Sequence, residues 1–222
     1  MPKLDEIALN IELVLISVIE GVALTKLAEG ALPVFVGLNA LQYIPYALAG
    51  LAILLVFWSQ AILHAVSFIR WPLRTEHMFL YFIAAFVQVI AYGSIDDLAS
   101  WFLWWTIFSV VAIAIYFIDL RMIREAAPRF AHLKGGPAFV KEVEERHIFE
   151  MKYLVPIAIA FNLICFTFAY GMPTLFDSPF VYATLGILQL LISLFALYDC
   201  MRNFKKRSAI LPSLFESGST KP

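Results

Sequence analysis

The sequence predicts an all-α, polytopic integral membrane protein with six transmembrane helices. Hydrophobic residues make up 62% of the 222 residues, only 15% are charged, and the mean hydropathy is +0.83. This composition is too apolar for a soluble domain of this size. The apolar residues also fall into six segments, each long enough to cross a hydrocarbon core of about 30 Å. We expect one transmembrane domain over residues 1–202 and a short cytoplasmic tail over residues 203–222.

Short connectors with polar or turn-forming residues separate these segments. Residues 29–44 carry glycine and proline among apolar residues and are predicted to form an external loop. Residues 120–146 are predicted to form a cytoplasmic segment, broken at Pro128 and at Gly135-Gly136-Pro137. A charged helix then runs directly into the fifth span. The expected spans are 7–28, 44–69, 77–95, 101–119, 147–170 and 180–201.

The basic residues predict how the chain is oriented. All but Lys26 of the 16 Lys and Arg residues lie near the termini or in the connectors after the second and fourth spans. The positive-inside rule then places both termini in the cytoplasm and the protein in the cell membrane, either a plasma membrane or a bacterial inner membrane. Aromatic residues are expected in belts at the two membrane surfaces, with Trp71 on the inner side. The expected outer belt is Tyr43, Tyr46, Trp101, Trp104, Trp105 and Tyr170.

The second and third spans form a hairpin with a polar stripe on each helix. The connector Arg70-Trp-Pro-Leu-Arg74 is short enough to require a tight antiparallel turn. A polar side chain that faces lipid costs several kcal/mol, so both stripes are expected to face other helices or a wet cavity. The stripes are Gln60, His64 and Ser67 on the second span, and His77, Tyr81, Gln88 and Tyr92 on the third.

Glu20 is the most informative residue, because it lies near the middle of the first span. A carboxyl group there must be paired, hydrated or protonated, and packing alone does not need an ionisable side chain. At similar depth lie Gln88, Gln189 and Asn162, each on another span. We interpret these residues as an ion or proton site, while interhelical hydrogen bonding is the alternative for the amides. Other expected pathway-lining residues are Gln60, Ser67, Tyr81, Tyr92 and Ser193.

Two pairs of residues suggest further chemistry. Glu12 and His64 lie at comparable depth and could form a titrating pair; equally, Glu12 could be a satisfied interfacial carboxylate and His64 a hydrogen-bonded histidine without function. Glu144 and His147 are three residues apart, which is the spacing of a carboxylate and an imidazole that share a metal. One such pair cannot complete a coordination sphere, and a solvated helix face explains it as well. No metal site is therefore predicted.

A weak internal similarity suggests a 3+3 inverted repeat. A shift of 101 residues aligns Tyr81 and Gln88 of the third span with Tyr182 and Gln189 of the sixth. Inverted repeats are common in transporters, whose sites lie between the halves. Coincidence between two apolar helices explains the match equally well.

Three functions are compatible with the sequence. The first is a transporter or channel for an ion or small solute, with its site around Glu20. The second is a non-transporting accessory or assembly subunit, or a sensor, with a partner in a membrane complex. The third is a haem protein that uses His64 and His77, or a membrane enzyme; no nucleophile elbow or phosphate loop supports an enzyme. Beyond haem no cofactor is predicted, and the expected partners are the lipid bilayer and a second copy of the chain, but no nucleic acid.

Overall fold

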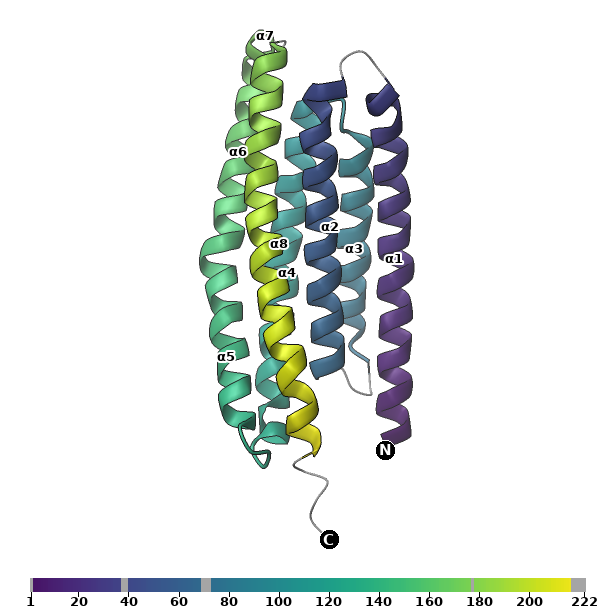
Figure 1. Ribbon diagram of the computed structural model, residues 1–222, viewed down its shortest axis with the longest axis vertical. Helices are drawn as coiled ribbons and strands as arrows, with labels where there is room; N and C mark the ends of the chain where they lie inside the picture. The colour runs from purple at the N-terminus through teal and green to yellow at the C-terminus, as the bar shows by residue number, and fades with distance from the viewer. Residues whose placement is uncertain (1, 37–39, 69–72, 177, 217–222) are drawn as a thin grey trace.

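The computed structural model describes residues 2–36, 40–68, 73–176 and 178–216, and it is an elongated helical bundle (Figure 1). The prediction of six membrane-spanning helices is confirmed, since six helical segments within the described residues are long and apolar enough to cross a bilayer. The helices are α1 (Pro2–Val36), α2 (Ala40–Phe68), α3 (Thr75–Gly93), α4 (Leu98–Phe130), α5 (Gly136–Phe149), the π-helical segment η1 (Glu150–Leu154), α6 (Val155–Gly171), α7 (Pro173–Phe176) and α8 (Pro179–Glu216).

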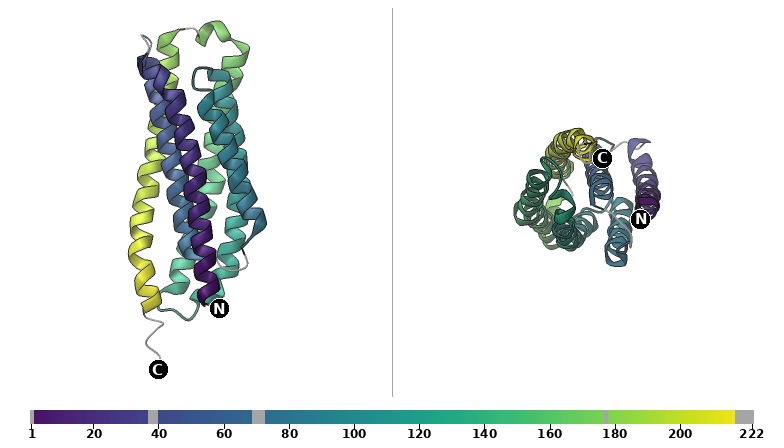
Figure 2. Two further views of the ribbon diagram at one scale, coloured as in Figure 1. Left: turned by 90° about the vertical axis from the view of Figure 1, so that its right-hand side faces the viewer. Right: turned by 90° about the horizontal axis from the view of Figure 1, so that it is seen from below.

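The helices run side by side along the bundle and pack in pairs. Helix α1 packs against α2 and α3, α3 packs against α4, α4 packs against α6, and α2 packs against α8. Two further views show this order around the bundle (Figure 2). Over their described residues, α6 and α8 do not pack closely against each other. The first described residues of α1 and the last of α8 lie at the same end of the bundle, called the terminal end below (Figure 1).

The predicted external loop over residues 29–44 is wrong. Helix α1 continues to Val36 and α2 begins at Ala40, while residues 37–39 lie outside the described residues. Pro33 falls in the last turn of α1, where it removes one main-chain hydrogen bond without ending the helix earlier. Gly30 is explained by packing, because a Cβ there would lie 2.5 Å from the main-chain oxygen of Tyr92 on α3.

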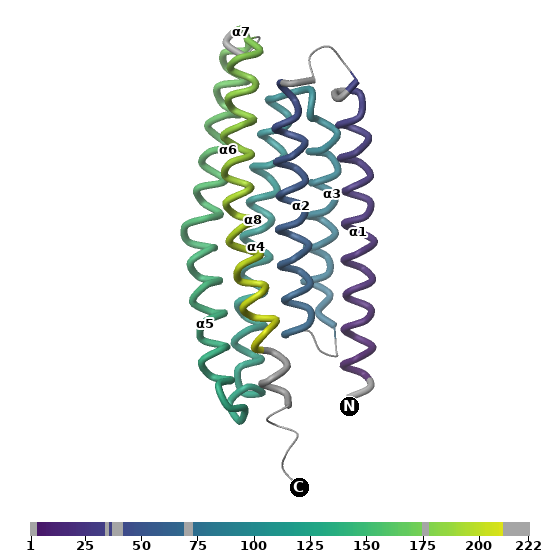
Figure 3. Tube along the Cα trace, viewed as in Figure 1, coloured from purple at the N-terminus to yellow at the C-terminus, as the bar shows by residue number. Residues whose placement is uncertain are grey.

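Two other helices are longer than predicted. Helix α4 passes residue 119 and Pro128 and ends at Phe130, so the chain breaks only before α5, where Gly135 has a φ of 84°. From there α5, η1 and α6 form one continuous helix along a side of the bundle, as predicted (Figure 3). Residues 203–216, predicted as part of a tail, continue α8, because Phe204 and Ile210 pack against the apolar core between α4 and α5.

The expected aromatic belt is wrong for three of its members. Trp101, Trp105 and Tyr46 are almost fully buried and meet edge to face, whereas Tyr170 is exposed as expected. They are buried because most of their polar atoms find partners inside the bundle, as the Trp101 indole does by donating to Gln189 at 2.7 Å. Trp71 and the connector residues 69–72 lie outside the described residues. The aromatic cluster is defined here as Tyr46, Tyr92, Trp101, Trp105 and Tyr182.

Candidate functional site

Five ionisable side chains from five helices meet inside the bundle toward the terminal end. They include three of the four histidines of the chain. Four of the five side chains are less than a tenth exposed, and that of His147 is 12% exposed. The histidine–carboxylate cluster is defined as Glu12 of α1, His64 of α2, His77 of α3, Asp119 of α4 and His147 of α5.

Asp119 is the centre of this cluster. Its Oδ1 lies 2.9 Å from Nε2 of His77 and 3.3 Å from Nε2 of His64. Its Oδ2 lies 3.7 Å from Nε2 of His147. The other ring nitrogen of His77, Nδ1, lies 3.4 Å from Oε1 of Glu12. His77 therefore bridges two carboxylates, and three imidazoles converge on Asp119.

These contacts replace the two pairs that the sequence suggested. Glu12 contacts His77 and not His64, because α1 packs along α3 at this level, and His64 contacts Asp119 instead. Glu144 and His147 do not converge either. Glu144 accepts a hydrogen bond from Arg124 at 2.7 Å, whereas His147 faces Asp119.

The cluster leaves buried polar atoms without hydrogen bonds. Among the described residues, Oε2 of Glu12 and Nε2 of both His64 and His147 have no hydrogen-bond partner. His64 is close to Asp119 but is not aligned for a hydrogen bond. Each unsatisfied buried group costs about 1–3 kcal/mol. The arrangement can therefore accept a further charged or hydrogen-bonding species at little additional cost.

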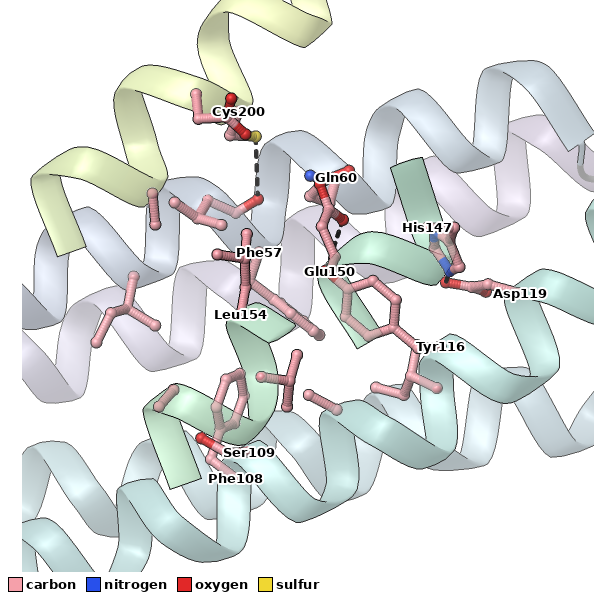
Figure 4. A pocket seen from close by; sticks show the side chains of 18 of the residues that line it. Phe57, Gln60, Phe108, Ser109, Tyr116, Asp119, His147, Glu150, Leu154 and Cys200 are labelled. Atoms are coloured by element: carbon pink, nitrogen blue, oxygen red, sulfur yellow. Dashed lines mark hydrogen bonds and ion pairs between the residues drawn. The ribbon is translucent and has the colours of Figure 1, made fainter. Parts of the chain in front are cut away.

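A cavity of about 240 Å³ lies beside the cluster, between α2, α4, α8 and the continuous helix α5–η1–α6. Figure 4 shows His147 and Asp119 pointing toward one another at its edge. Most of its lining is apolar, and it contains polar groups that the sequence analysis predicted as pathway-lining. These are Gln60, Ser67, Tyr81, Asn162, Gln189 and Ser193, together with His64.

The same cavity has charged residues that sequence reasoning missed. Glu150 accepts hydrogen bonds from Tyr116 at 2.9 Å and from Arg146 at 2.7 Å, and Arg146 also pairs with Asp199 of α8. Arg207 of α8 lines the cavity and is buried. The spacing of Arg146 and Glu150, four residues apart on one helix, was the available signal. This network links α8 to the continuous helix at the cavity wall.

The four residues of the predicted mid-membrane site lie in two separate places in the structure. Asn162 and Gln189 line the cavity, and Gln189 accepts the hydrogen bond of Trp101. Glu20 and Gln88 are buried between α1 and its neighbours, outside the cavity lining. None of their side-chain oxygen and nitrogen atoms has a hydrogen-bond partner in the described part of the chain. The hydroxyl group of Tyr92 donates a hydrogen bond to the main-chain oxygen of Gly50 at 3.0 Å, so a structural role explains this polar group.

Comparisons with protein-family models, with curated proteins and with solved structures find no match to this chain. The functional inference therefore rests on the arrangement of its own residues. That arrangement offers an unpartnered carboxyl group within a membrane span, a cavity with polar side chains, and a buried histidine–carboxylate cluster at the edge of that cavity.

Proposed function

We propose that this membrane protein is a transporter or channel for an ion or small solute, and that Glu20 is its ion- or proton-binding side chain. One observation carries the proposal. Glu20 is only 4% exposed within a membrane-spanning helix, and within the described residues both its carboxyl oxygens lack a hydrogen bond or ion pair. Burying such a group in a membrane costs at least a few kcal/mol, and packing alone gives no return for that cost.

The cavity, which Glu20 does not line, supplies a separate place for the solute in this proposal. A volume of about 240 Å³ lies below the roughly 300–1,000 Å³ of typical drug-sized sites, which favours an ion or a small solute. Gln60, Asn162 and Ser193 offer hydrogen-bonding groups from three different helices. Glu20 lies eight residues beyond Glu12, or about 12 Å farther along α1, which separates it from the histidine–carboxylate cluster.

Flux measurements in liposomes test the role of Glu20. Glu20→Gln keeps the shape of the side chain and removes its charge, so we expect ion or proton flux to fall at least about tenfold, the effect of roughly 1.4 kcal/mol. Glu20→Asp, which retains a carboxyl group, should keep part of the flux. Glu29→Gln is the matched control on the same helix, because Glu29 is exposed and pairs only with Lys26 among the described residues.

Two outcomes would contradict the proposal. If Glu20→Gln carries flux like the parent protein while Gln88→Leu fails to fold, the polar groups of α1 and α3 are scaffolding. If the parent protein moves no tested ion or proton, the alternative of an accessory or assembly subunit, or a sensor, is favoured instead. Circular dichroism and size-exclusion chromatography of each variant separate a loss of function from a loss of folding.

We further propose that both termini are cytoplasmic and that the chain lies in the cell membrane, because nearly all basic residues fall on the terminal side. Single cysteines at Asp96 and Lys141, which are both exposed, should react with a membrane-impermeant maleimide from opposite sides of the membrane. The two native cysteines are buried and should give little background. Labelling of both positions from one side would contradict this orientation. The predicted dimer stays a prediction.

A further inference from the structure

We propose that His64, His77 and Asp119 bind one divalent transition-metal ion, with His147 as a fourth ligand and Glu12 as the residue that orients His77. The inference goes beyond transport and does not depend on it. One ligand atom from each of His64, His77 and Asp119 lies within 4.8 Å of the other two, and all three residues are buried. They belong to three helices, so the folded bundle itself builds the site.

Two of the three imidazole distances around Asp119 fit tetrahedral coordination. With metal–ligand bonds of about 2.0–2.1 Å, neighbouring ligand atoms around Zn²⁺ lie ~3.3 Å apart. The three imidazole nitrogens lie 2.9, 3.3 and 3.7 Å from the nearest oxygen of Asp119. The first two distances, both to Oδ1, lie near the tetrahedral value, so small rotations would bring His64, His77 and Asp119 onto one ion. His147 contacts the other oxygen, Oδ2, and lies outside that compact group, so it has to move farther to become the fourth ligand.

Glu12 has the position of a supporting residue. Metal-bound histidines usually donate their second ring N–H to a carboxylate, which fixes the tautomer and the ring orientation. Oε1 of Glu12 lies 3.4 Å from Nδ1 of His77, on the ring side away from Asp119. A proton on Nδ1 leaves Nε2 of His77 free to bind a metal. Without a metal, that lone pair would face the carboxylate oxygen of Asp119.

A bound cation would also resolve the unsatisfied atoms of the cluster. Nε2 of His64 belongs to a side chain that is 92% buried, and it has no hydrogen-bond partner among the described residues. Nε2 of His147 is also unpartnered. The two carboxylates of the cluster bring negative charge into an apolar bundle, and a divalent ion would neutralise it.

The ligand set indicates the class of metal. Three imidazoles and one carboxylate suit Zn²⁺ and its first-row neighbours, whereas Mg²⁺ and Ca²⁺ prefer oxygen ligands throughout. The geometry disfavours haem between His64 and His77, because Oδ1 of Asp119 lies within 3.3 Å of both nitrogens, where the iron and its porphyrin would have to sit. His64, Asp119 and His147 also line the cavity, which gives an ion an entry path.

Zinc titration of the purified, chelator-treated protein in detergent tests the site. We expect one Zn²⁺ per chain by calorimetry and metal analysis, with a higher melting temperature when Zn²⁺ is bound. His77→Gln and Asp119→Asn each remove a ligand and should weaken binding more than ~100-fold, which exceeds the roughly 10–100-fold expected for the supporting change Glu12→Gln. His132→Gln is the matched control, because His132 is exposed and lies outside the cluster.

Several results would overturn the metal site. The first is that the parent protein takes up no Zn²⁺. The second is that His77→Gln binds Zn²⁺ as tightly as the parent. The third is that His132→Gln loses as much Zn²⁺ affinity as His77→Gln. If the ligand variants do not fold, X-ray absorption of the zinc-loaded parent decides: imidazole ligation supports the site, and its absence refutes it. In each refuting case the cluster is a metal-free ion-pair network. Because binding is measured without a gradient, the result is independent of whether Glu20 supports flux.

Discussion

At the end of the bundle far from the termini, the aromatic cluster buries polar atoms that are almost all paired. The hydroxyl groups of Tyr46, Tyr92 and Tyr182 each donate to a main-chain oxygen at 2.8–3.0 Å. The indole of Trp101 donates to Gln189, and Nε1 of Trp105 is the one unpartnered atom that the cluster has within the described residues. Toward the terminal end, the histidine–carboxylate cluster has the same number of residues but leaves three atoms without a hydrogen-bond partner in the described part of the chain.

The two clusters differ in how fully their buried polar atoms are hydrogen-bonded. Both draw rings and polar atoms from several helices, and both are buried. In the aromatic cluster the partners are mostly main-chain oxygens, which gain their hydrogen bonds from folding alone. In the histidine–carboxylate cluster the partners are other ionisable side chains, and the distances between imidazole nitrogens and carboxylate oxygens differ from one contact to the next. Because the aromatic cluster is almost fully hydrogen-bonded and the histidine–carboxylate cluster is not, the two clusters should respond differently to mutation.

Of the substitutions that test the difference between the two clusters, we expect Trp101→Ala to have the largest effect, a loss of stability. Trp101→Ala empties a fully buried site and strands the side-chain oxygen of Gln189, so the free energy of unfolding should fall by about 3–5 kcal/mol. Denaturation in detergent measures this loss. Trp58→Ala, at a position that is 39% exposed, should cost less than ~1 kcal/mol. Equal losses at the two positions, or a Zn²⁺ affinity that falls with Trp101→Ala in folded protein, would remove the distinction.

A smaller effect is expected from removing one hydroxyl group. Tyr46→Phe deletes the hydrogen bond to the main-chain oxygen of Tyr182 and keeps the ring packing, so it should cost about 0.5–1.5 kcal/mol of unfolding free energy. Tyr198→Phe, at an exposed position, is the control and should cost nothing measurable. Zn²⁺ affinity should be unchanged in both variants. A loss of zinc binding with Tyr46→Phe would mean that the two clusters are coupled.

The sequence was sufficient for the number of spans but not for their ends. Apolar length alone identifies a membrane helix, and all six are present within the described residues. The ends were misplaced because proline, glycine and charged residues were interpreted as breaks, although α1 continues through Pro33 and α4 through Pro128. Ending the fourth span at residue 119 placed Asp119 at the membrane surface. In the structure α4 continues to Phe130, and Asp119 is buried within the helical bundle. The 3+3 repeat stays a prediction.

For the residues of the candidate site, the sequence predicted the depth of each side chain in the membrane but not the side chains that it contacts. The position of a residue along its span gave the level of Glu12 and His64 within the bundle. Which helix each one faces depends on how the helices pack, and this gave Glu12 the partner His77. A signal was available, because three of the four histidines lie near the same predicted membrane boundary. Weighing the histidines together, and not as separate pairs, would have pointed to the cluster.

The π-helical segment η1 changes the angle between side chains that lie before it and after it on the same continuous helix. His147 lies before this segment and Asn162 after it, and on an uninterrupted α-helix their side chains would point about 60° apart. A π turn holds more residues than an α turn, so each residue rotates the helix less, and the angle between the two side chains shrinks. Both residues line the same cavity. The five residues of η1 thus change the direction in which the side chains of α6 point relative to those of α5. A polar stripe predicted with a constant 100° per residue is therefore misplaced after η1.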